Sequence, residues 1–358
     1  MRFVRNLSCS LVAALGLAVA AQAQPFDIYL SLAGAADGYV QVPTSPALNP
    51  SSQITIELFM SRSSSPAGCR SLLGKGYLTS YWIGICSGTL RSYLAGSASL
   101  KDGGTVASGV HHIAVTYDGA FRRHYIDGEL VAVFPQTGLL PANAQPLRLG
   151  ADVDFANNTI QGGIWEVRLW NVARTTAQIR HNINFPITGP TPGLVALWHL
   201  ADNSLDAVGG HHGGSPQGTS LFFPFCPGCG GNDCLVTPTN ACFFSHRFGV
   251  SGEFTLYTAP AADGHVTAGP SGSIGRVLGS SDSSTNLWFF DSANWEILVK
   301  GVNACSFNSR WWIYSAATTD VHYRLGVFDY VTGRVHYYFN FAGEPAPAVT
   351  DSSAFPCP

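Results

Sequence analysis

The feature that most constrains this chain is an alternation of apolar residues followed by a tight-turn signal. Residues 113–117 read Ile-Ala-Val-Thr-Tyr, so a β-strand would place the three larger side chains on one face. The next segment, 124–126, runs into Asp127-Gly128, a dipeptide that tolerates the positive φ angles of a short hairpin turn. The alternation resumes over 131–133. These residues predict antiparallel strands joined by a tight turn.

Similar signals recur through the first two thirds of the chain. Residues 54–60 alternate cleanly, and shorter strand-like runs occupy 39–42, 72–76 and 81–85. Glycine and proline residues separate these runs. Many short strands with frequent turns are typical of a β-sandwich or jelly roll, so we expect an all-β fold.

One helix is expected within this β-rich region. Thr175 and Gln178 have the spacing of a capping box, in which each side chain bonds a backbone N–H of the other residue. Ile179 and Ile183 then lie one turn apart on one helical face. We expect this short helix to pack across one end of the sandwich.

The N-terminus has the pattern of a secretory signal peptide. Arg2 and Arg5 precede an apolar run over 11–20, and Ala21-Gln22-Ala23 is a small-x-small cleavage site, so residues 1–23 would be removed. The apolar run is shorter than the ~20 residues of a membrane span. We therefore expect a protein without a membrane span that is secreted to an extracellular or periplasmic location or associated with the cell surface.

Length and composition bound the function. The chain has 358 residues, which favours two domains, and charged residues make up 11% of them, against ~25% in typical soluble proteins. The formal net charge is -3, and the sequence contains no basic block. Nucleic-acid binding is therefore not expected, and carbohydrate or an extracellular protein is the expected partner.

The composition divides the chain further. Residues 24–223 carry the strand pattern described above, and residues 224–240 form a Cys-, Pro- and Gly-rich linker. Residues 241–358 are again β-like, with a hairpin predicted at Thr332-Gly333. We expect this last segment to form a second, smaller β-sandwich domain.

The cysteines point to disulfides. Cys9 falls within the signal peptide, and an even number of cysteines in an exported chain favours disulfide bonds. Cys226 and Cys229 also have the spacing of two zinc ligands, but no second pair or ligand histidine follows at the usual spacing. Cys69 and Cys86 are alone in the first domain, so we expect them to pair. The cysteines of the mature chain are Cys69, Cys86, Cys226, Cys229, Cys234, Cys242, Cys305 and Cys357.

Several segments of the first domain resemble the laminin-G-like, or concanavalin-A-like, jelly roll. They are the hairpin around 109–133, the strand QITIEL at 53–58, LRLG at 147–150, QGGIWEVRLWNVAR at 161–174 and GLVALWHL at 193–200. The resemblance implies a jelly-roll sandwich. It leaves function open, because this fold hosts lectins, adhesion domains, pentraxins and glycosidases.

The second domain resembles an uncharacterised β-module found at the C-terminus of many predicted secreted bacterial proteins. The resemblance is carried by WFFD at 288–291, NWEILV at 294–299, Cys305, Asn308 and Trp311-Trp312. It implies a secreted bacterial protein and no particular activity.

Sequence signals for catalysis are weak. Glycosidases of this fold hold two carboxylates at catalytic distance on one strand, and none of the glutamates 57, 166, 253 and 296 has a carboxylate two residues away. Glu129 has Asp127 at this spacing, but Asp127 belongs to the predicted Asp127-Gly128 turn, so the two are not expected on one strand. The chain has no Gly-x-Ser-x-Gly elbow and no HExxH motif. We therefore expect a protein that is not an enzyme.

A calcium site is one interpretation of the loop after Gly150. Asp152, Asp154 and Asn157 offer oxygen ligands of the kind that calcium prefers, and laminin-G-like proteins often bind calcium at a sheet rim. Asp and Asn are also ordinary turn residues, so a solvated loop without metal is the favoured alternative. No other cofactor is expected.

Histidine pairs and tryptophans offer further candidates. Adjacent strand residues point to opposite faces, so His111 and His112 are expected to be one buried and one exposed residue. For the same reason, at least one of Trp311 and Trp312 should face outward, and this pair is the candidate ligand-binding surface of the second domain. Trp82 and the other tryptophans in strands of the first domain are expected in the core.

The sequence therefore predicts a secreted, two-domain β protein. Its favoured function is non-catalytic binding of carbohydrate or an extracellular protein surface through the loop rim of the jelly roll. A structural, surface-assembly or adhesion component that binds no small ligand is the alternative, and a glycan hydrolase or lyase is the third.

Overall fold

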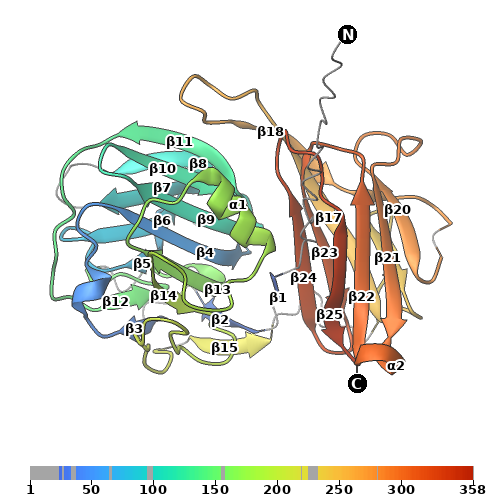
Figure 1. The fold of residues 1–358 in the computed structure, drawn as a ribbon, viewed down its shortest axis with the longest axis horizontal. Coiled ribbons are helices and arrows are strands. Elements are labelled where there is room, and N and C mark those ends of the chain that lie inside the picture. The colour runs from blue at the N-terminus through green and yellow to red at the C-terminus, as the bar shows by residue number, and fades with distance from the viewer. Residues whose placement is uncertain are drawn as a thin grey trace, which may run out of the picture.

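The computed structural model describes residues 24–25, 28–33, 38–63, 67–94, 100–154, 158–218, 220–224, 233–279 and 281–357. Its strands form four sheets that pack as two sandwiches side by side (Figure 1). The signal peptide expected at 1–23, the candidate calcium ligand Asn157, and Cys226 and Cys229 lie outside the described residues.

The first sandwich contains an eight-stranded and a six-stranded antiparallel sheet. The eight-stranded sheet has the order β11 (Glu129–Pro135), β10 (Phe121–Ile126), β9 (Gly109–Tyr117), β4 (Ile54–Arg62), β13 (Gln161–Trp170), β2 (Ile28–Ala33) and β15 (Leu221–Pro224), with β14 (Leu194–Trp198) also paired to β13. The six-stranded sheet has the order β3 (Val40–Val42), β12 (Leu147–Leu149), β5 (Cys69–Gly74), β6 (Tyr81–Cys86), β7 (Thr89–Leu94) and β8 (Lys101–Thr105). A short 3-10 helix, Pro46–Leu48, follows β3.

The core between these two sheets follows from the alternation in the sequence. Ile113, Val115 and Tyr117 of β9 are fully buried in one apolar cluster with residues of the six-stranded sheet. The hairpin prediction is confirmed, because β9, β10 and β11 pair in antiparallel order. Asp127 and Gly128 form the turn between β10 and β11 with φ angles of 51° and 81°, the left-handed conformation that this turn requires.

The second sandwich is also antiparallel. One of its sheets has the order β1 (Gln24–Pro25), β24 (Arg334–Asn340), β23 (His322–Asp329), β17 (Phe248–Tyr257) and β16 (Asn240–Phe243), with β18 (Ala268–Ser273) paired to β17. The other has the order β19 (Gly275–Arg276), β20 (Ser284–Trp288), β21 (Ile297–Ala304), β22 (Arg310–Ala317) and β25 (Val349–Pro356), and α2 (Cys305–Asn308) follows β21. Strand β1 was expected within the first domain, but it pairs with β24, so the first described residues belong to the sheet of the second sandwich.

Helix α1 (Thr176–Asn184) lies on the outer face of the eight-stranded sheet, on the side that faces the second sandwich (Figure 1). The predicted capping box is present, with both reciprocal bonds between Thr175 and Gln178. Ile179 and Ile183 are fully buried in an apolar cluster that also contains side chains of β24. The helix therefore packs between the two sandwiches.

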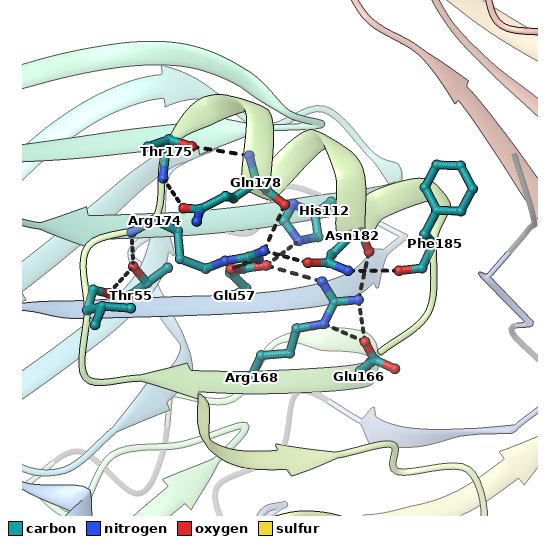
Figure 2. A network of polar contacts seen from close by, with 11 residues as sticks. Thr55, Glu57, His112, Glu166, Arg168, Arg174, Thr175, Gln178, Asn182 and Phe185 are labelled. Atoms are coloured by element: carbon teal, nitrogen blue, oxygen red, sulfur yellow. Dashed lines mark hydrogen bonds and ion pairs between the residues drawn. The ribbon is translucent and has the colours of Figure 1, made fainter. Parts of the chain in front are cut away.

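A buried carboxylate fixes this helix to the sheet (Figure 2). Glu57 of β4 is fully buried and accepts hydrogen bonds from Arg174 at 2.6 Å and Arg168 at 3.2 Å. Arg174 also donates to the Gln178 carbonyl and the Asn182 side chain, and Arg168 donates to the Asn182 carbonyl, so both arginines tie the sheet to α1. Burial alone would raise the pKa of Glu57, but the neighbouring His112 imidazole, 3.6 Å away, and the two arginine charges lower it from 4.5 to about 2.

Helix α1 in turn bonds the second sandwich. The Asn184 amide donates to the Phe339 carbonyl at 2.9 Å and accepts from the Phe339 N–H at 3.0 Å, which satisfies both backbone groups of this β24 residue. Arg180 donates to Glu129 at 2.6 Å, and Glu129 also accepts from the Ala342 N–H at 2.8 Å. We call this contact region between the sandwiches the seam.

Replacing Glu57 by Gln tests the first of these links. Glu57→Gln leaves two buried arginines without their shared counter-charge, and breaking such a pair costs about 3–5 kcal/mol of the free energy of unfolding. Urea unfolding followed by tryptophan fluorescence measures this loss. The control is Glu344→Gln, since Glu344 pairs with Arg180 but its side chain is 51% exposed, and we expect a loss below about 1 kcal/mol. An equal loss of unfolding free energy in both variants would contradict the role of Glu57 as the carboxylate that fixes α1 to the sheet.

The same carboxylate predicts a dependence on pH. Its pKa is about 2 in the folded protein and 4.5 ordinarily, so its stabilising effect is complete above pH 4.5 and is lost as the pH falls toward 2. The difference in unfolding free energy between the wild-type protein and Glu57→Gln should therefore shrink over this range. Urea titrations at several pH values measure it, and a constant difference would show that Glu57 titrates normally.

Candidate functional site

The outer face of the six-stranded sheet carries a row of side chains that cross five strands. Gln41, Arg148, Gly74, Trp82 and Tyr93 are successive cross-strand partners on β3, β12, β5, β6 and β7. Their sequence neighbours on these strands include the buried core residues of the first sandwich, so the members of the row point away from that core. Together with Tyr77, which follows β5, we call Trp82 and Tyr93 the outer aromatic face.

The three aromatic rings of this face contact one another. Tyr77 meets Trp82 edge-on, with ring centroids 5.2 Å apart, and stacks on Tyr93 at 5.2 Å with an interplanar angle of 27°. The Trp82 indole lies across Gly84, where any Cβ would collide with the ring, and its N–H donates to Ser71 at 2.8 Å. Trp82 was expected in the core, and it is buried, but on the outer side of the six-stranded sheet. Tyr77 and Tyr93 are partly exposed.

Paired charges surround these rings. Arg91 of β7 forms a bidentate ion pair with Asp102 of β8, at 2.5 and 2.6 Å, and also approaches the sulfur of Cys69. At the other end of the row, the Arg148 guanidinium lies 4.2 Å from the centre of the Tyr39 ring. The face therefore combines partly exposed aromatic rings with two arginines, of which Arg91 is paired with a carboxylate and Arg148 packs on a ring.

The calcium candidate Asp152 lies on the same face, where it has a structural role. Its carboxylate sits over Gly74 and accepts hydrogen bonds from the N–H groups of Gly76, Tyr77 and Asp154, each at 3.0 Å. Asp152 is fully buried, and burial raises the pKa of its carboxyl. These bonds hold the loop that positions Tyr77.

The structure thus brings Asp152 and Asp154 together, and Asp154 also accepts a 3.4 Å hydrogen bond from the Leu78 N–H. Within the described ranges, no three His, Cys, Asp or Glu side chains form a group that could hold a metal ion. The third candidate ligand, Asn157, lies outside those ranges. Calcium binding therefore stays a prediction.

The two candidate tryptophans of the second sandwich separate, as adjacent residues of a strand must. Trp311 is 7% exposed and packs in the core against Phe244 and Phe248. Trp312 points outward, where Phe307 contacts it edge-on and its N–H donates to Asn308 at 3.0 Å. Only the Trp312 ring of this pair is placed to meet a ligand.

Disulfides join the cysteines of three pairs in the described part of the chain. Cys69 and Cys86, the pair favoured by the sequence, are direct cross-strand partners on β5 and β6. The other two pairs stabilise the second sandwich and join Cys234 to Cys242 and Cys305 to Cys357.

Both histidines of the first pair are buried, so the expectation that one of them is exposed was wrong. His112 is fully buried near Glu57, and His111 is 8% exposed beside side chains of the second sandwich. The physical reason is the seam, because a surface that an isolated jelly roll would expose is covered here.

The outer aromatic face was missed by the sequence analysis, although a signal for it exists. Trp82 lies between the core residues Tyr81 and Ile83, and Tyr93 alternates with Leu90 and Leu94 of its strand. The same alternation that predicts the core therefore also predicts that these two side chains face away from it. Tyr77 had no such signal, because it comes from a loop that is held over the sheet by bonds to residues far along the chain, Asp152 among them.

Substitution of Asp152 tests its structural role. Asp152→Ala removes one buried acceptor of three backbone N–H groups, and we expect a loss of about 1–3 kcal/mol of unfolding free energy with or without calcium. Asp154→Ala is the matched control, because Asp154 is exposed and should change stability by about 0.5 kcal/mol or less. Urea titration in calcium and in chelator measures both. A loss that appears only in calcium would instead indicate a metal ligand.

Comparison with known proteins agrees with this architecture. Residues 34–180 match the sequence model of the concanavalin A-like lectin/glucanases superfamily. No curated protein matches the chain in a search by sequence. A helix long and apolar enough to cross a membrane is absent from the described residues.

Several solved structures are similar in fold. A Bacteroides ovatus protein, whose description proposes carbohydrate binding, is 17% identical over 57% of this chain and 60% of its own, with a TM-score of 0.47. Domains LG4-5 of the mouse laminin alpha1 chain are 12% identical over 96% of this chain and 84% of their own, with a TM-score of 0.36. A heptameric pentraxin from Limulus polyphemus is 14% identical over 44% of this chain and 82% of its own, with a TM-score of 0.34.

These identities are low, and the chain spans only 60% of the length of the Bacteroides ovatus protein, so these three likenesses carry no information on function. The fold itself rests on the strand order, the sheet pairing and the family match. Residues 34–180 therefore belong to a laminin-G-like jelly roll of the concanavalin A-like superfamily.

Proposed function

We propose that this protein binds carbohydrate without transforming it, and that the outer aromatic face of the jelly roll is the binding surface. The observation that carries the proposal is the contact of Tyr77, Trp82 and Tyr93 on the outer side of the six-stranded sheet. Sequence analysis expected the loop rim, and this site includes it, since Tyr77 and Asp152 both come from loops at the ends of strands.

The chemistry of this face suits a glycan. Aromatic rings offer flat apolar surfaces against which the C–H groups of a sugar ring can pack. Arg148 and Gln41 lie in the same cross-strand row and can hydrogen-bond hydroxyl groups. Arg91 is already paired with Asp102, so its charge is compensated within the protein.

The packing on the eight-stranded sheet also favours the six-stranded sheet as the binding surface. The outer side of the eight-stranded sheet is used by α1 and the second sandwich, with Phe59, Tyr125 and Trp165 buried in one cluster with residues of β24. A ligand would have to displace this packing. The six-stranded sheet is the one whose outer face carries partly exposed rings.

A non-catalytic role is proposed because the glutamates tested from the sequence are occupied by structural bonds. Glu57 and Glu166 bind arginines, Glu129 binds Arg180, Glu253 binds Arg324, and Glu296 accepts from the Phe289 N–H. Secretion is proposed from the signal-peptide pattern and from the three disulfides, since disulfides persist mainly in oxidising compartments.

Assembly with another protein is the second candidate function. It is favoured by a separate exposed apolar group on the second sandwich, where Phe307 is 79% exposed beside Trp312 and Tyr314. Aromatic residues of this kind are common at protein interfaces.

A glycan array of the chain from Gln24 tests the proposal. We expect saturable binding to one glycan class, and we expect Tyr93→Ala to weaken it about tenfold or more, which is ~1.4 kcal/mol for a lost stacking ring. Tyr314→Ala on the second sandwich is the matched control and should leave binding unchanged. The bound glycans should be recovered uncleaved.

Repeating the array with calcium and with chelator adds a second comparison. Loss of binding in chelator would support a calcium ion at the loop of Asp152 and Asp154. No binding to any glycan under either condition would reject the carbohydrate proposal and favour assembly. If Tyr93→Ala and Tyr314→Ala weakened glycan binding equally, the outer aromatic face would be rejected as the binding surface.

A further inference from the structure

A cavity of about 270 Å³ lies at the seam, well away from the outer aromatic face. Residues from both sandwiches line it. His111 and Asp127 come from the first sandwich, and Glu253, Thr255, Ser271 and Arg324 come from the second. We call this cavity the seam pocket. Its volume is just below the ~300–1,000 Å³ of typical small-molecule sites, so only a small ligand would fit.

The first sandwich contributes an oriented histidine. The carboxylate of Asp127 binds Nδ1 of His111 at 2.7 Å and accepts from the His112 N–H at 2.8 Å, so both oxygens of Asp127 are engaged. Burial raises the pKa of Asp127, but the His111 imidazole and the nearby Arg324 and His322 outweigh it and hold the pKa below its usual range. In the neutral imidazole, the ionised carboxylate fixes the tautomer of His111 with the proton on Nδ1.

The other nitrogen of His111 is then an acceptor. Nε2 is buried and has no hydrogen-bond partner among the described residues, and His111 as a whole is 8% exposed. An unsatisfied buried polar atom costs about 1–3 kcal/mol, and native structures normally give such an atom a partner. A hydroxyl group in the pocket would supply the missing donor.

The charges around the pocket are compensated within the protein. Arg324 pairs with Glu253 at 2.9 Å and lies 5.4 Å from the centre of the Tyr337 ring. His322, which also lines the pocket, is 3.3 Å from the carboxylate of Glu129. An ionic ligand would therefore find no free counter-charge among these groups, and an uncharged one is favoured.

The remaining walls offer hydroxyl groups and one ring. Thr255, Ser271 and Ser273 of the second sandwich and Ser108 of the first contribute side chains that both donate and accept hydrogen bonds. Phe254 adds an apolar ring at the same site. Alternating hydroxyls with one aromatic wall match a compact polyol better than an apolar molecule.

We propose that the seam pocket is a second binding site, which takes an uncharged, hydroxyl-rich ligand the size of one monosaccharide unit, with Nε2 of His111 accepting a ligand hydroxyl. The proposal is independent of the outer aromatic face, which lies on the opposite sheet of the first sandwich. Because both sandwiches line the pocket, the bound ligand links them and stabilises the folded chain by mass action.

Two pairs of single substitutions, each with a test variant and a control, separate ligand binding in the pocket from folding. Ser271→Trp fills it from an exposed position on β18, and Ala268→Trp, exposed on the same strand but outside the pocket, is its matched control. His111→Asn keeps a donor for Asp127 near the position of Nδ1 but removes Nε2, whereas His111→Gln places an amide near the position of Nε2. The histidine variants therefore distinguish ligand binding from folding.

The experiment titrates the full chain from Gln24 with D-glucose, D-galactose, D-mannose, L-fucose and L-rhamnose, with D-glucuronate as the charged comparison. Calorimetry at up to ~10 mM sugar detects dissociation constants near 1 mM. We expect at least one neutral sugar to bind and to raise the melting temperature. Ser271→Trp and His111→Asn should weaken it tenfold or more, with Ala268→Trp, His111→Gln and Tyr93→Ala close to the wild-type protein.

Each other result overturns the proposal. No saturable binding of any neutral sugar would reject the ligand class, and binding of D-glucuronate alone would reject the uncharged ligand. Neutral-sugar binding that Tyr93→Ala abolishes and Ser271→Trp leaves intact would belong to the outer aromatic face. That outcome supports the proposed function while rejecting the seam pocket. The proposed function itself is rejected by the glycan array and not by this titration.

Discussion

The buried carboxylate of Glu57 is the interaction on which the arrangement of the two sandwiches depends. It lies on β4 in the middle of the eight-stranded sheet and binds the two arginines that hold α1 against that sheet (Figure 2). The helix carries Arg180 and Asn184, which bond Glu344 and Phe339 of the second sandwich. Without Glu57, Arg174 would be a buried charge with no carboxylate partner and Arg168 would keep only Glu166, so the helix would lose contacts that orient Arg180 and Asn184.

This arrangement decides which surfaces remain for ligands. Laying α1 and β24 over the eight-stranded sheet buries Phe59 and Trp165 and leaves the six-stranded sheet as the outward side of the jelly roll. At the same time it brings the ends of β9 and β10 against polar residues of β17 and β23, where the apolar contact stops and the seam pocket begins. Both candidate sites thus follow from the packing of α1 and β24 on the eight-stranded sheet.

Local signals were sufficient to predict the fold of the first sandwich. The alternation of 113–117, the Asp127-Gly128 turn and the capping box of Thr175 each act within a few residues, so their pattern is readable in the chain. The sites depend on residues far apart in sequence. Asp152 places Tyr77 across 75 positions, and His111 is buried because the second sandwich covers it, which no pattern around either residue encodes.

The charge pattern connects the composition to the proposed ligands. The chain has 19 Lys and Arg and 22 Asp and Glu, a low content, and much of it is spent on internal pairs such as Glu57 with Arg174, Arg247 with Asp329 and Glu253 with Arg324. Charges used in this way satisfy buried donors and cannot attract ions over a distance. What remains on the outer aromatic face is aromatic and amide surface with the Arg148 guanidinium, and the seam pocket adds hydroxyl groups and one ring. Surfaces of this kind select their partners largely by shape and hydrogen bonding.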